Sequence, residues 1–336
     1  MKPRLALIPG DPSGIGPELV ARLLSDPALA GQADILMIGD RAVFERGMAQ
    51  AGLTFGLAAC DPGAGDWTGR RDEAFAWQET ETLDLSDSPV AEVSEASGRS
   101  VLATLDLALD AARDGLVDGV VFAPFNKAAM CAAGLSQDDE LHYMAERLGV
   151  ETYISELNTL DGLWTSRVTS HIALKEVAGA IAGERICEAV ALIDRTLKRS
   201  GLARPRISVA ALNPHAGDGG KFGREEIDII RPAVERMAQR QVAVDGPWPS
   251  DTVFLKAKAG EIDAVVTMYH DQGQIALKLM GFDRGVTVQG GIPFPVTTPA
   301  HGTAFDIAGR GRADPGAMRA AFSLACDMVT NWAGAT

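Results

Sequence analysis

The sequence has little of several features that mark other classes of protein. Its 336 residues include four cysteines, none of them in a Cys-X-X-Cys pair, which excludes a disulfide framework and a zinc ribbon. No run of about 18 apolar residues occurs, so no transmembrane helix is expected. The apolar stretch near the N-terminus meets Pro9 and Gly10 too early for a secretory signal, and we therefore expect a cytoplasmic protein.

Basic residues are scarce relative to acidic ones. The chain has 31 lysines and arginines and 45 aspartates and glutamates, which gives a net charge of −14. This charge repels both the phosphate backbone of nucleic acids and anionic membrane surfaces. We therefore expect neither a nucleic acid nor a membrane as a partner. The hydrophobic content of 46% is sufficient for a sizeable core.

Short apolar runs alternate with amphipathic stretches along the chain. The runs predict buried strands, and apolar residues at helical spacing predict helices between them. Strands are expected over residues 5–8, 34–38, 119–122, 207–212 and 264–268, and helices over residues 99–114, 184–200 and 314–332. This alternation predicts an α/β fold with a largely parallel sheet. Residues 61–98 predict irregular surface with one hairpin, and the lack of a clear linker indicates that two domains would be interleaved.

Three of the five histidines follow expected strands. His171, His215 and His270 each lie at or just after a strand end, where parallel sheets bind their ligands. Neutral imidazole suits zinc, cobalt or nickel, so the three could converge on one divalent metal with an open position for a substrate. Their separations of 44 and 55 residues match no local zinc motif. Three unrelated polar residues in loops are the alternative.

Two glycine-rich stretches stand near the two ends of the chain. Residues 9–18 (PGDPSGIGPE) follow the first strand and open a helix, without the GxGxxG or P-loop pattern, so a purely structural turn is an alternative there. Residues 301–311 (HGTAFDIAGRG) place His301, Thr303 and Asp306 beside a flexible backbone. A carboxylate near an adenosine can bind the ribose hydroxyls and repel a 2′-phosphate.

These two blocks, together with residues 212–220 (LNPHAGDGG) and 268–273 (MYHDQG), resemble the 4-hydroxythreonine-4-phosphate dehydrogenase family of vitamin B6 biosynthesis. The blocks follow the family order along essentially the whole chain. The first and last also resemble the isocitrate and isopropylmalate dehydrogenases. The resemblance implies two interleaved α/β domains of that type with the active site in the cleft between them. Residues 1–130 plus 297–336 would form an outer, cofactor-side domain, and residues 131–296 a central domain with the metal site and the dimer interface.

The resemblance also implies cofactors and a partner. One divalent metal per active site (zinc, cobalt, magnesium or manganese) would be held by His171, His215 and His270. The protein would be a homodimer with shared active sites, in which the residue at the His270 position comes from the partner subunit. NAD, or alternatively NADP, would bind the segment that contains His301, Gly302, Thr303 and Asp306, and Asp306 would favour NAD.

The substrate positions depart from the family pattern. The family's histidine and threonine fall on Glu140 and Leu141, with His142 one step later. The family lysine is kept as Lys278, whereas the family asparagine and arginine become Thr287 and Val296. Loss of cationic donors disfavours a phosphate dianion. We therefore expect a paralogue for a non-phosphorylated hydroxy acid, unless the loop is shifted and Lys278, Lys127 or Arg284 compensates.

The expected reaction is the metal-dependent, NAD-linked oxidation of a secondary alcohol in a small hydroxy acid, with decarboxylation of the resulting β-keto acid. Lys278 would stabilise an oxyanion, transfer a proton or simply bind a carboxylate. Asp251 would orient a ligand histidine, act as a base or cap a helix over residues 252–259, and Asp271 would support His270. The alternatives are a true 4-hydroxythreonine-4-phosphate dehydrogenase, an aromatic cis-dihydrodiol carboxylate dehydrogenase and, from a different class, a phosphoacyl transferase of related fold. The three histidines and Asp306 argue against a phosphoacyl transferase, which would need neither a metal site nor a nicotinamide-binding segment.

Overall fold

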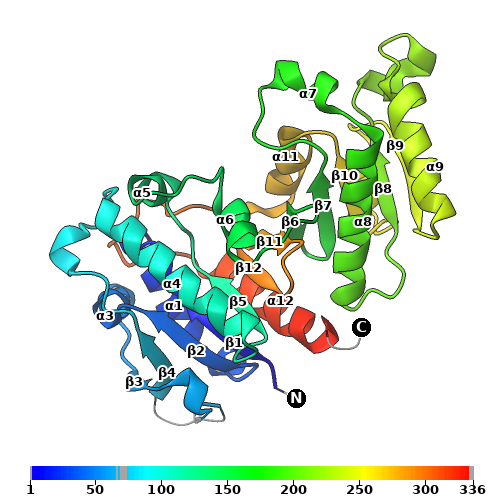
Figure 1. Ribbon diagram of the computed structural model, residues 1–336. Helices are drawn as coiled ribbons and strands as arrows, with labels where there is room; N and C mark the ends of the chain where they lie inside the picture. Colours follow the sequence, from blue (N-terminus) through cyan, green and yellow to red (C-terminus); the bar gives the residue numbers. More distant parts are fainter. Residues whose placement is uncertain (1, 66, 69–73, 333–336) are drawn as a thin grey trace. The chain divides into compact units, whose positions relative to one another are not determined.

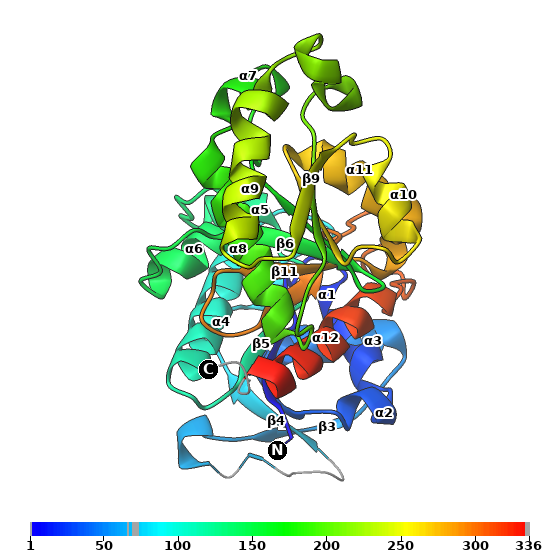
Figure 2. The ribbon, with the colours of Figure 1, turned by 90° about the vertical axis from the view of Figure 1, so that its right-hand side faces the viewer.

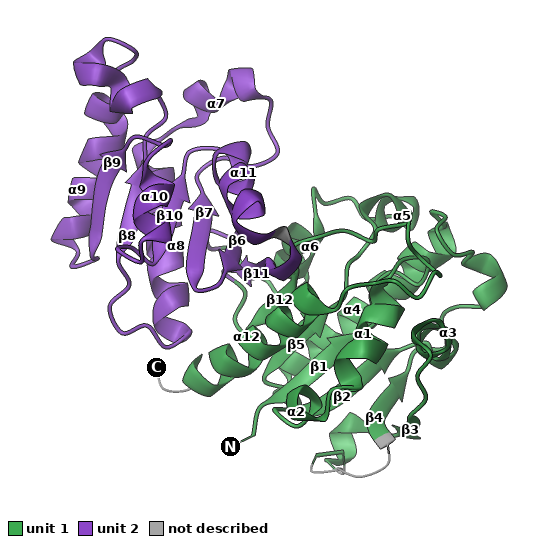
Figure 3. Cartoon of the chain, turned by 180° about the vertical axis from the view of Figure 1, so that it is seen from behind, with its two compact units in different colours: residues 1–151, 292–334, 336 green, residues 152–291, 335 purple. Residues whose placement is uncertain are grey.

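The computed structural model describes residues 2–65, 67–68 and 74–332, which belong to two compact units. Unit 1 comprises residues 1–151 and 292–334, and unit 2 comprises residues 152–291 (Figure 3). The chain therefore leaves unit 1, completes unit 2 and returns. Each unit contains its own strands and its own flanking helices (Figure 1).

The described strands of unit 1 are all parallel and follow the order β3-β4-β2-β1-β5-β12. The central strand β1 pairs with β2 on one side and with β5 on the other, and its apolar run is buried as expected for a strand covered on both faces. The strand bounds are β1 Arg4–Ile8, β2 Asp34–Gly39, β3 Gly56–Ala59, β4 Ala74–Glu79, β5 Gly119–Phe122 and β12 Val296–Pro299.

Helices cover both faces of the unit 1 strands (Figure 2). The helices α1 (Gly16–Leu24), α2 (Pro27–Ala30), α3 (Arg41–Ala51) and α12 (Gly316–Trp332) lie on one side. The opposite side carries α4 (Glu95–Arg113), with α5 (Lys127–Ala132) and α6 (Glu140–Arg147) beside it. Leu5 and Leu7 of β1 pack with Leu19 of α1 and Phe322 of α12 in one fully buried core. Two short 3-10 helices span η1 Pro62–Ala64 and η2 Leu85–Asp87.

The described strands of unit 2 follow the order β11-β6-β7-β10-β8-β9. Only β6 runs antiparallel to its neighbours β11 and β7, while β7, β10, β8 and β9 are parallel. The strand bounds are β6 Ser155–Leu160, β7 Leu163–Arg167, β8 Ile207–Ala210, β9 Val244–Trp248, β10 Ala264–Thr267 and β11 Val286–Gly290.

The helices of unit 2 are also divided between two faces. Helices α8 (Gly183–Arg199) and α9 (Arg231–Gln239) lie on one side of β9, and α10 (Val253–Lys258) and α11 (His270–Gly281) lie on the other (Figure 2). Leu277 of α11 and Val253 of α10 share a buried cluster with Val265 of β10. The remaining elements are α7 Leu174–Ala180, η3 Pro214–Gly220, the π-helical turn η4 Glu226–Ile230 and η5 Phe282–Arg284.

The predicted strands and helices are confirmed, with ends that shift by a few residues. The hairpin expected within residues 61–98 is wrong for the described part of that segment, since β4 pairs in parallel with both β2 and β3. Trp77 of β4 explains the difference, because its ring is 1% exposed and stacks on Phe44 with the centroids 5.6 Å apart. A hairpin at the surface would leave that ring in water.

The units divide at 151/152 and 291/292, whereas the sequence places the domain boundaries at 130/131 and 296/297. Helices α5 and α6 remain with unit 1 because both pack against α4. Met130 of α5 is buried beside Val101 of α4. The Tyr143 hydroxyl of α6 donates to Asp106 Oδ1 of α4 at 2.8 Å.

In the described part of the chain, every helix is too short or too polar to cross a membrane.

Candidate active site

Two of the three predicted metal ligands lie side by side in unit 2. His171 follows β7 and His270 begins α11 directly after the neighbouring strand β10, and their ring centroids are 5.7 Å apart. Both line a pocket of 220 Å³. His270 Nδ1 lies 2.7 Å from Asp271 Oδ1, which leaves Nε2 as the nitrogen for a ligand. Asp271 thus has the supporting position that the sequence predicts.

The third predicted ligand, His215, lies in a strained turn. Six consecutive residues, 215–220, have positive φ, and His215, Ala216 and Asp218 among them are not glycine. His171 also has a positive φ, of 52°. Left-handed backbone costs a non-glycine residue roughly 1 kcal/mol or more, and such strain concentrates at functional sites. The strain is therefore consistent with a functional role for both histidines.

A buried carboxylate holds the chain just before His215. Glu226 is fully buried, and its Oε1 accepts the backbone N–H groups of Leu212 at 2.9 Å and Asn213 at 2.7 Å. Its Oε2 accepts from Asn213 Nδ2 at 2.9 Å. Glu226 begins a π-helical turn, a feature frequent at functional sites. Sequence reasoning missed Glu226, and a buried glutamate following a glycine-rich loop has no local signature.

One chain does not bring the three histidines together. Among the residues that the structure describes, no group of three histidine, cysteine, aspartate or glutamate side chains is arranged to hold a metal ion. The His215 ring instead faces Phe222, with the ring centroids 6.3 Å apart. The expectation from the resemblance assigns His270 to the partner subunit, whereas here His270 lies beside His171 of its own chain. Two adjacent imidazoles, one of them held by Asp271, fit a divalent metal. A third imidazole ligand would have to come from elsewhere.

The predicted substrate positions on α6 and β12 belong to unit 1. Glu140 is the first residue of α6, and Asp139 caps that helix through the N–H of His142 at 2.9 Å. The ring of His142 also bonds to Asp139, with Nδ1 2.6 Å from Oδ1. Leu141 is 2% exposed and Val296 is fully buried. Neither apolar side chain offers a hydrogen bond.

The predicted substrate and catalytic positions of unit 2 are Thr287, Lys278 and Asp251. Thr287 of β11 is buried, and its hydroxyl accepts from Asn158 Nδ2 at 2.9 Å. Lys278 is exposed on α11, and Asp251 is exposed just before α10. The alternative that Asp251 caps this helix is wrong, because the residue that precedes the first helical residue is Thr252.

A polar network that the sequence analysis missed connects this region to the histidines. Asn158 Oδ1 accepts from Gln274 Nε2 of α11 at 2.6 Å and from Arg167 Nη1 at 3.2 Å. Arg167 is 5% exposed, forms an ion pair with Glu156, and donates through Nε to Ser170 Oγ at 2.9 Å. Because Ser170 precedes His171, the network fixes the strand end that carries this histidine. The polar residues Glu156 and Asn158, two apart on β6 and so on one strand face, are the signal that could have revealed it.

The cofactor segment predicted from the sequence packs on the N-terminal glycine-rich turn within unit 1. The Thr303 carbonyl accepts from the Ile15 N–H at 3.1 Å, and a Cβ on Gly14 would lie 2.8 Å from Thr303 Cβ. Fully buried Glu18 accepts from the Ala313 N–H at 3.0 Å. The rest of the predicted segment is more open: His301 is half-buried, with Nδ1 3.0 Å from the Gly302 carbonyl, and Gly302 and Asp306 are exposed.

Asp11 lies in the same turn, at the carboxyl end of β1. Its N–H donates to the carbonyl of Pro124, which follows β5, so Asp11 stands between the two strands where the strand order reverses. Ligands bind at such points in α/β sheets. Asp11 is fully buried, and among the residues that the structure describes only its Oδ1 has a hydrogen-bond partner, the Ser13 N–H at 2.9 Å. Burial raises the pKa of Asp11 to about 6, against the opposing effects of the Ser13 N–H and Arg46.

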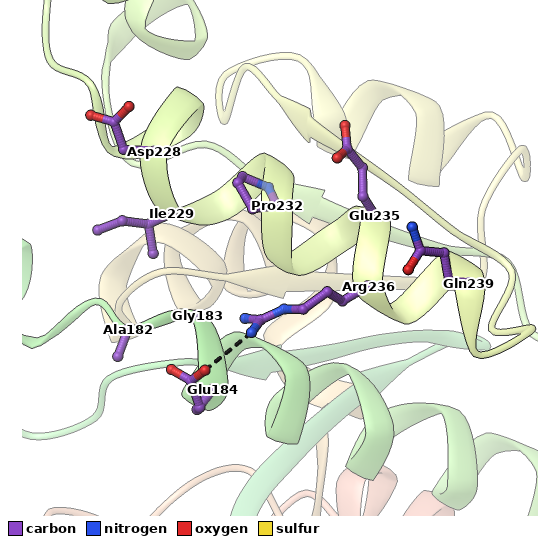
Figure 4. A pocket seen from close by; sticks show the side chains of 9 residues that line it. All are labelled: Ala182, Gly183, Glu184, Asp228, Ile229, Pro232, Glu235, Arg236 and Gln239. Carbon is purple, nitrogen blue, oxygen red and sulfur yellow. Dashed lines mark hydrogen bonds and ion pairs between the residues drawn. The ribbon is translucent and has the colours of Figure 1, made fainter.

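A larger pocket of 510 Å³ lies in unit 2 at the start of α8 and along α9 (Figure 4). The ion pair of Glu184 Oε1 with Arg236 Nη1, 3.1 Å apart, closes one side of it. None of the predicted site residues lines this pocket. It is therefore not the candidate active site.

Comparison with known proteins identifies the family. The family model described as pyridoxal phosphate biosynthetic protein PdxA matches residues 31–325. The chain belongs to the PdxA family. This confirms the resemblance recognised in the four motifs. PdxA-family proteins are NAD-dependent dehydrogenases that act on a CH–OH group and use a divalent metal, so the chain is an oxidoreductase and the alternative of a phosphoacyl transferase is not supported.

Three relatives cover nearly the whole chain. A Pseudomonas aeruginosa protein provisionally named 4-hydroxythreonine-4-phosphate dehydrogenase 2 is 54% identical, over 97% of each chain. The crystal structure of 4-hydroxythreonine-4-phosphate dehydrogenase from Klebsiella pneumoniae is 35% identical, with a TM-score of 0.86 over 98% of each chain. The crystal structure of a terephthalate 1,2-cis-dihydrodiol dehydrogenase from Burkholderia xenovorans is 30% identical in sequence. Its TM-score is 0.65, over 96% of this chain and 97% of that one.

A more distant likeness concerns the fold alone. Isocitrate dehydrogenase from Methylococcus capsulatus is 16% identical, with a TM-score of 0.50 over 99% of this chain and 87% of that one. The predicted fold class of the isocitrate dehydrogenase type is thereby confirmed.

We expect Asp11→Asn to stabilise the protein at high pH only. The folded pKa of about 6 lies above the ordinary value of 3.8, so the folded state binds the proton more tightly. The stability from this group is present below pH 3.8 and is lost as the pH rises through 6, a loss of about 3 kcal/mol. Urea unfolding at pH 3.5, below both pKa values, and at pH 8 measures it. Equal effects at both values would contradict the assignment.

We expect Glu226→Ala to lower the free energy of unfolding by about 3 kcal/mol, because it leaves buried N–H groups of the turn before His215 without acceptors. Neighbouring Glu225 accepts from Asn213 Nδ2 at 2.6 Å and from no backbone N–H in the described structure. Glu225→Ala is therefore the matched control and should cost less than about 1 kcal/mol. Urea unfolding compares the two variants. Similar losses for both would show that Glu226 has no special role.

Proposed function

We propose that this PdxA-family dehydrogenase oxidises a secondary alcohol of a small, non-phosphorylated hydroxy acid. The observation that carries the proposal is the scarcity of phosphate donors at the predicted substrate positions, of which Lys278 supplies a cation and His142 an imidazole. Leu141 and Val296 are buried and apolar, and Glu140 adds a negative charge where the family has a histidine. The Thr287 hydroxyl already accepts a hydrogen bond from Asn158. A phosphate dianion needs cationic or N–H donors that these side chains lack.

The metal in this proposal is divalent and held by His171, His215 and His270. It would supply Lewis-acid polarisation of the alcohol oxygen and of the ketone that follows. Three imidazoles favour zinc or cobalt over magnesium or manganese. His270 is held in one tautomer by Asp271, and His171 is positioned through Ser170 and Arg167.

In the proposed reaction, NAD would accept a hydride from the alcohol carbon while the hydroxyl proton goes to a base. The β-keto acid that results loses carbon dioxide, and a proton is taken up at the carbon that the carboxylate leaves. Lys278 and Asp251 are our candidates for these proton transfers. NAD would bind along His301, Gly302, Thr303 and Asp306, where the exposed Asp306 carboxylate would repel the 2′-phosphate of NADP.

We further propose a homodimer in which two copies complete each metal site. His171 and His270 are adjacent in one chain and His215 is not among them, so the partner's His215 would be the third ligand. Helix α11, which His270 begins, presents Ile275 and Leu279 at 60% and 84% exposure. These residues are four apart and share one helix face, which a second copy would cover.

Substrate choice is tested by NADH formation in the metal-loaded protein. We expect a non-phosphorylated compound, 4-hydroxythreonine or terephthalate cis-dihydrodiol, to be the better substrate. Its kcat/KM should exceed that of 4-hydroxythreonine-4-phosphate at least about 100-fold, because the loss of two charge-assisted hydrogen bonds to the phosphate costs that much binding energy. The variant Glu140→His should raise kcat/KM for the phosphorylated compound alone. Efficient turnover of 4-hydroxythreonine-4-phosphate by the wild type would instead identify a biosynthetic PdxA enzyme.

Mixed dimers test which chain supplies each ligand. His171→Ala and His215→Ala, each inactive alone, should together recover about a quarter of wild-type activity, because half of randomly paired dimers have one intact site of two. His171→Ala mixed with His270→Ala should recover none, since every site then lacks one ligand. Recovery in the second mixture but not in the first would assign His270, rather than His215, to the partner subunit.

A further inference from the structure

The antiparallel strands β11, β6 and β7 of unit 2 carry a row of polar side chains on one face. Side chains alternate between the faces of a strand, so Thr287 and Gln289 of β11 point the same way. They pair across the strands with Asn158 and Glu156 of β6, respectively. Helix α11 packs over this face, as the bond from Gln274 Nε2 to Asn158 Oδ1 at 2.6 Å indicates.

Gln289 differs from its neighbours in this row. Thr287, Asn158, Arg167 and Glu156 all make hydrogen bonds or ion pairs with one another. Gln289 is 2% exposed, yet neither Oε1 nor Nε2 of its amide has a hydrogen-bond partner in the described structure. A buried amide without partners is costly, and such a group in a native protein calls for an explanation.

The surroundings of Gln289 constrain what it could bind. The buried guanidinium in the row, that of Arg167, is already neutralised by Glu156, so it adds no net positive charge. The amide of Gln289 is neutral and offers both a donor and an acceptor. This combination matches a hydroxyl next to a carboxylate, or a pair of hydroxyls. It does not match a phosphate dianion, which accepts hydrogen bonds and needs positive charge.

We propose that Gln289 is a specificity-determining residue of the substrate site. Its Nε2 would donate to an oxygen of the substrate and its Oε1 would accept a hydroxyl proton from a non-phosphorylated hydroxy acid. The inference rests on the proposed function. It adds a contact two residues from Thr287, on the same strand face, that the sequence analysis did not assign.

The test uses Gln289→Met, which keeps the length of the side chain and removes both polar ends. The matched control is Thr159→Val, which changes a buried residue of similar exposure on the opposite face of β6. Each metal-loaded variant is assayed by thermal unfolding and by NADH formation with 4-hydroxythreonine, terephthalate cis-dihydrodiol and 4-hydroxythreonine-4-phosphate.

For Gln289→Met we expect KM for the preferred compound to rise about tenfold or more, with a smaller change in kcat and a Tm equal to or above that of the wild type. An apolar replacement removes an unmade hydrogen bond, so stability should not fall. Thr159→Val should leave KM within about twofold of the wild-type value.

Two results would overturn the proposal. An unchanged KM with a lowered Tm would mean that the amide holds a structural water. An equal rise of KM in Gln289→Met and Thr159→Val would mean that any change to these strands loosens the site. A wild type that uses only the phosphorylated compound would refute the proposed function instead. The KM of Gln289→Met for that compound would then decide separately whether the amide touches the substrate.

Discussion

Carboxylates that are buried or half-buried hold the loops on which the candidate site depends. Glu226 binds the backbone just before the strained turn of His215. Glu156 pairs with Arg167, which in turn binds Ser170 next to His171. In unit 1, Glu18 binds the N–H of Ala313, just beyond the predicted cofactor segment. A carboxylate removed from water must be matched by donors, so each of these loops is fixed in the conformation that supplies them.

The proposed preference for a non-phosphorylated substrate rests on the charges of the side chains at the predicted substrate positions. Among the predicted substrate positions of unit 2 and the polar row beside them, the cations are the exposed Lys278 and Arg167, whose charge Glu156 already neutralises. The other predicted substrate positions carry a carboxylate, two apolar side chains, an imidazole and a hydroxyl, at Glu140, Leu141, Val296, His142 and Thr287. What unit 2 offers instead is a row of amides and hydroxyls, Asn158, Thr287, Gln274 and Gln289. Such groups recognise hydroxyl and carboxylate oxygens by geometry rather than by charge.

Much of the fold could be predicted because it depends on local patterns. The apolar runs of β1, β5 and β10 and the amphipathic stripe of α8 are visible in the sequence, and all formed as expected. The parallel pairing of β4 was missed, since its stability comes from Trp77 stacking on Phe44, 33 residues away. The helices α5 and α6 lie in unit 1 for a similar reason, their contacts with α4. Local propensity contains no information about such packing.

The sequence by itself determined the order of strands and helices, the glycine-rich turns, the family and the histidines most suited to a metal, because each depends on residue type and spacing along the chain. Only the tertiary structure decided which polar groups meet. Asn158 and Thr287 are 129 residues apart and share a hydrogen bond, and Glu18 reaches Ala313 across 295 residues. The structure likewise placed His171 beside His270 and left His215 apart. Hydrogen bonds require donor and acceptor within about 3 Å, and only the folded chain sets that distance.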